Sequence, residues 1–139
     1  MGRHRKLDGI DASWLAIDAQ GQVAVFTTGG EGPIPETALA SVETGEELIQ
    51  LLPEVSGHEL FTSVPRQADF VYFAKRGLFA YDWSDVHRVA SKAMGAYELQ
   101  ALPTSPRHIS QLPASVQVLA GATQLAGVAF GPKLVKVST

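Results

Sequence analysis

The chain has 139 residues, of which 45% are hydrophobic and 18% are charged, a balance that is typical of one globular domain and excludes a disordered chain. Fourteen acidic residues against eleven basic ones give a formal net charge of -3, which argues against a nucleic-acid partner. The chain has no cysteine, and this excludes disulfides, thiolate metal ligands and a cysteine nucleophile.

The sequence shows no export or membrane signal. Its basic start, residues 1–6, is not followed by the apolar segment of a secretory signal, because Asp8 and Asp11 interrupt it. The stretch 116–131 is too polar and too short to span a membrane. We therefore expect a cytoplasmic protein that forms a single domain over residues 1–139, with a flexible tail at its first ten residues.

The first predicted element is a β-hairpin. Two apolar runs, 14–18 and 22–27, flank a turn at 19–21 whose glycine suits a positive φ. Alternation places Trp14 and Leu15 on opposite faces of the hairpin. We expect one face to be core and the other to be partly polar.

A helical region follows. Apolar residues at helical spacing run through 36–52 and stop before a proline. Thr44 and Glu47 have the spacing of a capping box, which favours a break at Gly45 between two helices. Residues 55–69 then read as a connecting loop with one short extended piece near its middle.

The aromatic runs 69–74 and 78–82 flank a link at 75–77 that ends in glycine, and this pattern predicts a second β-hairpin. Because hairpins dominate and regular βαβ alternation is missing, the expected class is α+β. We expect a mainly antiparallel sheet of about five to seven strands, with two or three helices packed on one face. The remaining predictions are strands at 96–101, 125–130 and 134–137, and a short helix at 109–119 with Ser110 as its cap.

Asp82, Asp85 and His87 form the first candidate site. Carboxylates and an imidazole together can hold a divalent metal or transfer protons. The structural alternative is that Asp82 ends a strand while Asp85 and Arg88 form a solvated pair. A bound metal usually needs three or more protein ligands, and a catalytic triad is recognised only by its geometry. We therefore assign no metal, no cofactor and no catalytic residue.

The loop 29–35, Gly-Gly-Glu-Gly-Pro-Ile-Pro, is the second candidate site. It follows a strand and precedes a helix, as phosphate-binding loops do, but its prolines lack N–H donors and Glu31 repels anions. One interpretation is a stiff connection whose glycines permit tight turns. The other is a recognition loop that presents Glu31 and Pro33 to a partner.

Two segments resemble known proteins. The run Trp14-Leu-Ala-Ile-Asp-x-x-Gly-x-Val-Ala-Val-Phe-x-Thr-x-Gly-x-Gly-Pro-Ile-Pro35 and the segment Gly77-Leu-Phe-Ala-Tyr-Asp82 look like those of a group of small uncharacterised bacterial proteins. Some of these are similar to immunity proteins of polymorphic toxin systems. The segments cover under a third of the chain and contain no catalytic residue. The resemblance implies a cytosolic single-domain protein that binds a cognate toxin, or another protein, and neutralises it by occlusion.

We expect a protein-binding module, with an immunity-type inhibitor as its most specific form. Acidic contacts would suit a basic target such as a nuclease toxin. The alternative is a small-molecule or metal-binding protein, or an enzyme, built on the Asp82, Asp85 and His87 cluster. A third interpretation is a structural subunit of a homo-oligomer. The expected partner contacts are Glu31, Pro33, Asp82, Trp83, Asp85 and His87.

Overall fold

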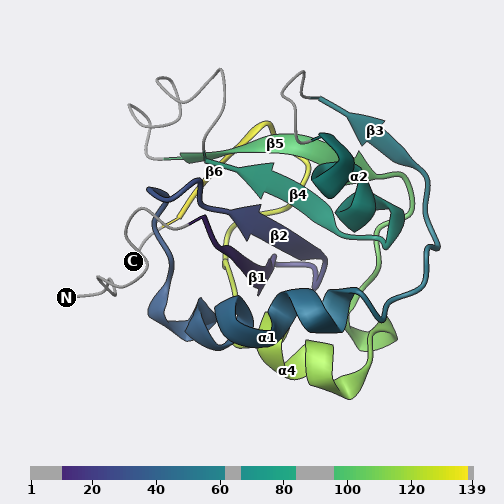
Figure 1. Ribbon diagram of the computed structural model, residues 1–139, viewed down its shortest axis with the longest axis horizontal. Coiled ribbons are helices and arrows are strands. Elements are labelled where there is room, and N and C mark those ends of the chain that lie inside the picture. The colour runs from purple at the N-terminus through teal and green to yellow at the C-terminus, as the bar shows by residue number, and fades with distance from the viewer. Residues whose placement is uncertain (1–10, 62–66, 84–95, 138–139) are drawn as a thin grey trace.

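The computed structural model begins its sheet with the predicted hairpin (Figure 1). The structure describes residues 11–61, 67–83 and 96–137. Strands β1 (Ser13–Ile17) and β2 (Val23–Thr27) pair antiparallel, which confirms the first hairpin. Gly21 closes the turn with a φ of +78°, a conformation that glycine adopts without steric penalty.

Six strands of the described chain form one curled sheet in the order β1-β2-β4-β5-β3, and β6 also pairs with β5. The other strands are β3 (His58–Leu60), β4 (Phe79–Asp82), β5 (Ala96–Pro103) and β6 (Leu134–Lys136). Among the strand pairs of the described residues, only β2 and β4 run parallel, and the other pairs are antiparallel. The predicted α+β class with a mainly antiparallel sheet is therefore confirmed.

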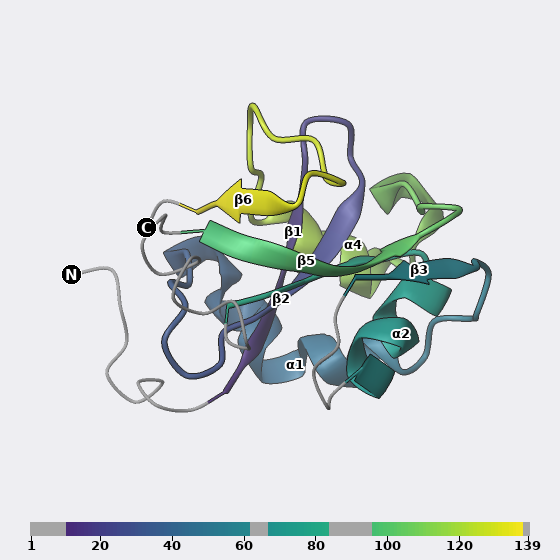
Figure 2. The same cartoon turned by 90° about the horizontal axis from the view of Figure 1, so that it is seen from above.

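Helices cover one face of this sheet (Figures 1 and 2). The described α-helices are α1 (Leu39–Ile49), α2 (Gln67–Lys75) and α4 (Ala114–Gly121), and the short 3-10 helices η2 (Glu36–Ala38) and η3 (Ile109–Gln111) precede α1 and α4. Apolar side chains of the helices pack on one side of the first hairpin. This core includes Leu15, Val23, Val25, Ile49, Phe70, Phe73, Val116 and Ala120.

Aromatic side chains fill the opposite face. Phe26 lies at their centre and stacks on Trp14 with ring centroids 4.3 Å apart and on Tyr81 with centroids 5.3 Å apart. The C-terminal segment closes this face through Phe130 and Val135. Both faces of the hairpin are therefore buried, and the expectation of one partly polar face is wrong. The C-terminal segment lies far away in the sequence, so the local pattern gave no sign of this cover.

The predicted second hairpin is also wrong, because its first run is the helix α2. Phe70, Phe73 and Ala74 are buried at helical spacing. Gly77 has a φ of +86° and donates its N–H to Ala74 O, while Leu78 N–H donates to Phe73 O. This pair of hydrogen bonds is a Schellman motif, which ends a helix. The glycine that suggested a hairpin turn therefore terminates a helix instead.

Helix α1 runs without a break through Gly45, contrary to the prediction. Thr44 donates its hydroxyl to Ala40 O one turn earlier, so it does not cap a second helix. Gly45 is buried, and a Cβ there would make an ordinary contact 3.6 Å from Leu15 Cδ1. Gly45 therefore lies on the side of α1 that faces β1 and does not interrupt the helix.

The C-terminal third matches the sequence predictions in part. Strands β5 and β6 confirm those predicted at 96–101 and 134–137, whereas 125–130 is not a strand. The helix predicted at 109–119 is divided into η3 and α4 by Pro113. Ser110 is not the cap. Instead, His108 Nδ1 accepts the N–H of Ser110, and Gln111 Oε1 accepts the N–H of His108.

Because of Tyr81, the free energy of unfolding should decrease at alkaline pH. The Tyr81 hydroxyl donates to Pro132 O at 2.9 Å and accepts from Gly131 N at 3.0 Å. Burial raises the pKa of Tyr81 to about 12; the Gly131 hydrogen bond lowers it and the Asp18 charge raises it. The folded state therefore keeps the proton more tightly than the unfolded state. The resulting stability is fully present below pH 10 and is lost as the pH rises to about 12, by about 2–3 kcal/mol in total.

Urea unfolding of the protein and of Tyr81→Phe between pH 8 and 12 measures this loss. The variant should be less stable at pH 8, because the N–H of Gly131 and the C=O of Pro132 lose their hydrogen bonds to the Tyr81 hydroxyl. The difference between the two proteins should shrink as the pH rises. A difference that stays constant to pH 12 would contradict the assignment.

Candidate functional site

The loop 29–35 is held against the aromatic face of the sheet. Tyr97 donates its hydroxyl to Pro33 O at 2.8 Å and accepts from Trp14 Nε1 at 3.2 Å. Gly32 lies so close that a Cβ there would come within 2.8 Å of Tyr97 Cζ. Glu31 is exposed, whereas Pro33 is only half-buried and most of the remaining loop is buried. These contacts favour the stiff connection over a freely presented loop.

The structure buries both described members of the other predicted contact segment. Asp82 is 1% exposed and Trp83 is 7% exposed. Thr27 donates its hydroxyl to Asp82 Oδ1, and Trp83 lies edge-on to Tyr97 on the aromatic face, with centroids 5.1 Å apart. Asp85 and His87 lie outside the described residues, so their predicted role stays a prediction.

Asp82 belongs to a row of polar residues that crosses the sheet. Ser13 lies opposite Thr27, Thr27 opposite Asp82, and Asp82 opposite Glu98 in the strand register. Residues directly opposite each other share one face of a sheet. The row therefore lies at one end of the apolar core, on the face of the sheet that the helices cover. The row has no local sequence signal, because its four residues come from four strands and meet only through strand pairing.

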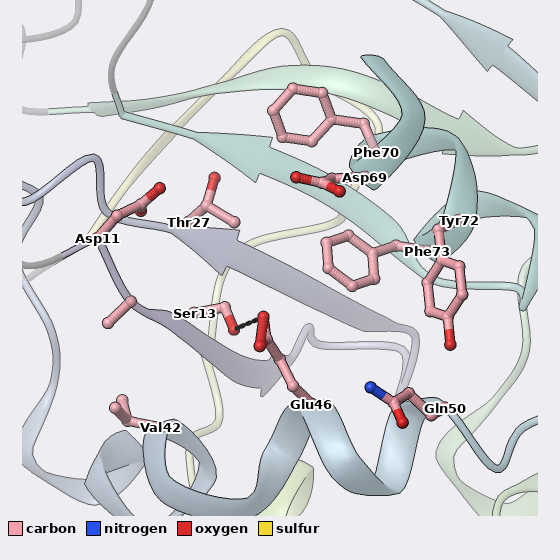
Figure 3. A pocket seen from close by; sticks show the side chains of 11 residues that line it. Asp11, Ser13, Thr27, Val42, Glu46, Gln50, Asp69, Phe70, Tyr72 and Phe73 are labelled. Atoms are coloured by element: carbon pink, nitrogen blue, oxygen red, sulfur yellow. Dashed lines mark hydrogen bonds between the residues drawn. The ribbon is translucent and has the colours of Figure 1, made fainter. Parts of the chain in front are cut away.

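A cleft of about 470 Å³ opens beside this row, between α1 and α2 (Figure 3). The side chains of Ser13 and Thr27 line it at the sheet. Its other polar lining residues in the described chain are Asp11, Glu46, Gln50 and Asp69, and its aromatic wall consists of Phe70, Tyr72 and Phe73. The cleft thus combines acidic and aromatic side chains from separate parts of the chain.

Helical spacing brings several side chains to the cleft. Val42, Glu46 and Gln50 recur every four residues and follow one side of α1. Asp69 belongs to the first turn of α2, and its carboxylate points toward the strands in Figure 3. The sequence pattern predicted a strand at Asp69 and therefore did not indicate that Asp69 lies near Glu46.

Two acidic groups of the cleft accept hydrogen bonds from neighbouring residues. Glu46 Oε2 accepts a hydrogen bond from Ser13 Oγ at 3.3 Å, and Asp11 Oδ1 accepts from Gly29 N at 2.9 Å. None of the described residues lining the cleft is lysine, arginine or histidine. Among the described lining residues, the three carboxylates of Asp11, Glu46 and Asp69 therefore favour a negative potential, which attracts cations.

Arg76 holds the outer part of the aromatic wall. Its guanidinium carbon lies 3.6 Å from the centroid of the Tyr72 ring, and its Nη1 donates to Tyr72 O at 3.0 Å. Glu54 lies 3.7 Å from the same nitrogen. This arrangement shows a guanidinium stacked on an aromatic ring of the wall.

The described residues contain no group of three or more His, Cys, Asp or Glu side chains placed to hold one metal ion. Nor does any helix among them have the length and apolar character needed to cross a membrane.

The chain matches no protein-family model, no curated protein and no solved structure. Inference about its function therefore depends on the geometry of the cleft.

Proposed function

We propose that this protein is a protein-binding module whose cleft between α1 and α2 receives a basic segment of a partner protein. The observation that carries the proposal is the lining of the cleft. Asp11, Glu46 and Asp69 supply negative charge beside an aromatic wall, with no basic residue among the described lining. A lysine or arginine side chain satisfies both features, because carboxylates pair with its charge and aromatic faces attract cations.

The segments 14–35 and 77–82 resemble small uncharacterised bacterial proteins, some of which are similar to immunity proteins, and this resemblance supports an inhibitor that works by occlusion. Occlusion needs a surface of complementary charge and no reacting group. The net charge of -3 favours encounter with a basic target such as a nuclease toxin. The exposed Glu31 serves as a secondary contact in this proposal. We place the protein in the cytosol because it has no cysteine.

The cleft carboxylates should control binding of a basic segment. We expect the double variant Glu46→Gln/Asp69→Asn to weaken the binding of an arginine-rich peptide by roughly tenfold, because two attractive charges are lost. The matched control is Glu43→Gln/Glu47→Gln, which removes the same charge from exposed positions of α1 outside the cleft lining. Isothermal titration calorimetry at 50 and 300 mM salt measures both.

The control variant should change the dissociation constant by less than about twofold at 300 mM salt, because screening weakens distant charges. Equal losses in the two variants would mean that net charge alone attracts the peptide and would contradict a cleft site. Affinity capture from native lysate extends the test to whole proteins. A basic protein retained by the wild type and the control, but released by the cleft variant, would identify the partner.

The alternative of a metal-binding protein built on Asp82, Asp85 and His87 makes a different prediction. Under that alternative, divalent ions raise the melting temperature, and His87→Ala abolishes the increase. Under our proposal, melting is insensitive to Mg²⁺, Mn²⁺ and Zn²⁺ at millimolar concentration. Differential scanning fluorimetry with each ion, and with EDTA as the reference, distinguishes the two.

A further inference from the structure

The strand β3 lies at the outer edge of the sheet in both views (Figures 1 and 2). Thr104 N donates to Gly57 O at 3.0 Å, and Phe61 N donates to Gln100 O at 2.7 Å. Backbone groups of an antiparallel strand face the same neighbour at every second residue. His58 and Leu60 therefore direct their N–H and C=O groups away from β5.

No described residue forms a hydrogen bond with these outward backbone groups, and all three side chains of β3 are exposed. The outer edge of β1 differs, because Ser41 Oγ accepts the N–H of Leu15 and Thr123 O accepts the N–H of Ile17. The fold therefore covers one edge of the sheet and leaves β3 open. An open edge can pair with another extended chain.

We propose that β3 pairs with an extended segment of the partner protein that carries a lysine or arginine opposite Glu59. The inference deepens the proposed function and rests on it for the claim that the partner is a basic protein. The added strand would bond to the outward N–H and C=O groups of His58 and Leu60. Leu60 and Phe61, which are 37% and 48% exposed, supply apolar contact beside these bonds.

Charge distinguishes this occupant from a second copy of the chain. In the antiparallel register that uses both outward residues, His58 of one copy would lie opposite Leu60 of the other. Glu59 would then lie directly opposite Glu59. Like charges in that position destabilise a strand pair, whereas a cation opposite Glu59 stabilises it. Glu59 thus opposes self-pairing and favours a basic strand.

A blocked peptide, Thr-Val-Thr-Lys-Thr-Val-Thr, tests the edge directly at millimolar concentration. We expect the amide NMR signals of His58 and Leu60 to shift and their hydrogen exchange to slow as the peptide binds. The same peptide with glutamate in place of lysine should bind about threefold to fivefold more weakly. A third peptide, N-methylated at alternate residues on its bonding edge, should not bind, because its donors are removed.

Two protein variants complete the test. Glu59→Lys should reverse the preference between the lysine and glutamate peptides. Leu60→Pro removes an outward N–H that the fold does not use, and an edge strand tolerates proline there; it should abolish peptide binding. If Leu60→Pro fails to fold, the reversal by Glu59→Lys still decides the question.

Three results would overturn the inference. The first is the absence of any shift at His58 and Leu60 with the lysine peptide, and the second is equal binding of the N-methylated peptide. Slower exchange that depends on protein concentration, without peptide, would assign the edge to a second copy. If only the signals of Glu46 and Asp69 shift, the peptide binds in the cleft and not at the edge of β3. Failure of one proposal is therefore distinguishable from failure of the other.

Discussion

Replacing Phe26 with alanine is expected to lower the free energy of unfolding by about 4–5 kcal/mol. Phe26 is fully buried and stacks between Trp14 and Tyr81. Edge-on contacts with Tyr97 and Phe130 complete its surroundings. The substitution removes the ring from all four contacts and leaves a cavity that these rigid aromatic rings cannot fill. Guanidinium chloride denaturation, followed by far-UV circular dichroism, measures the loss.

The control for this measurement is Phe61→Ala. Phe61 is 48% exposed, and its removal should lower the free energy of unfolding by less than about 1 kcal/mol. Similar losses at the two positions would show that the aromatic face is not a packed core.

Asp18→Ala is expected to lower the free energy of unfolding by about 3–4 kcal/mol. The carboxylate of Asp18 is buried. Its Oδ1 accepts the N–H groups of Gln20 and Gln22, both at 2.9 Å, and its Oδ2 accepts the N–H of Phe130 at 2.8 Å. Alanine leaves all three donors without this acceptor. Urea denaturation at pH 7 measures the effect.

Asp18→Asn provides the control, because the amide keeps the shape of the side chain and one acceptor oxygen. That oxygen can retain the two bonds to the turn, while the amide nitrogen then faces the N–H of Phe130. The loss should therefore be about half of that for alanine. If alanine and asparagine are both within 1 kcal/mol of the wild type, the carboxylate does not anchor the C-terminal segment.

Local pattern predicted the first hairpin because every signal for it lies within the segment itself. Two apolar runs, a short link and a glycine with positive φ are sufficient to define the pairing of β1 with β2. The structure of the segment 69–77 was harder to predict. Its aromatic residues favour strands, and its final glycine fits either a hairpin turn or a helix end. The burial of Phe70, Phe73 and Ala74 on one side of a helix decided the outcome.

The cleft could not be predicted for a different reason. It requires Asp69 to be helical and α1 to continue through Gly45, and the sequence pattern indicated otherwise at both positions. The alignment of Thr27 with Asp82 also depends on a parallel strand pairing that no local sequence motif predicts. The sequence analysis expected acidic contacts at residues 82–87, whereas the acidic residues of the cleft are Asp11, Glu46 and Asp69.

The parallel pairing of β2 with β4 has a consequence for the order of folding. The contact between Thr27 and Asp82 joins residues 55 positions apart, so the centre of the sheet forms only after a long loop closes. The N-terminal hairpin can form early, but Phe130 and Val116, which help to cover its two faces, are synthesised much later. Until then it exposes apolar strands, which makes the nascent chain prone to aggregation and dependent on rapid completion of its C-terminal third.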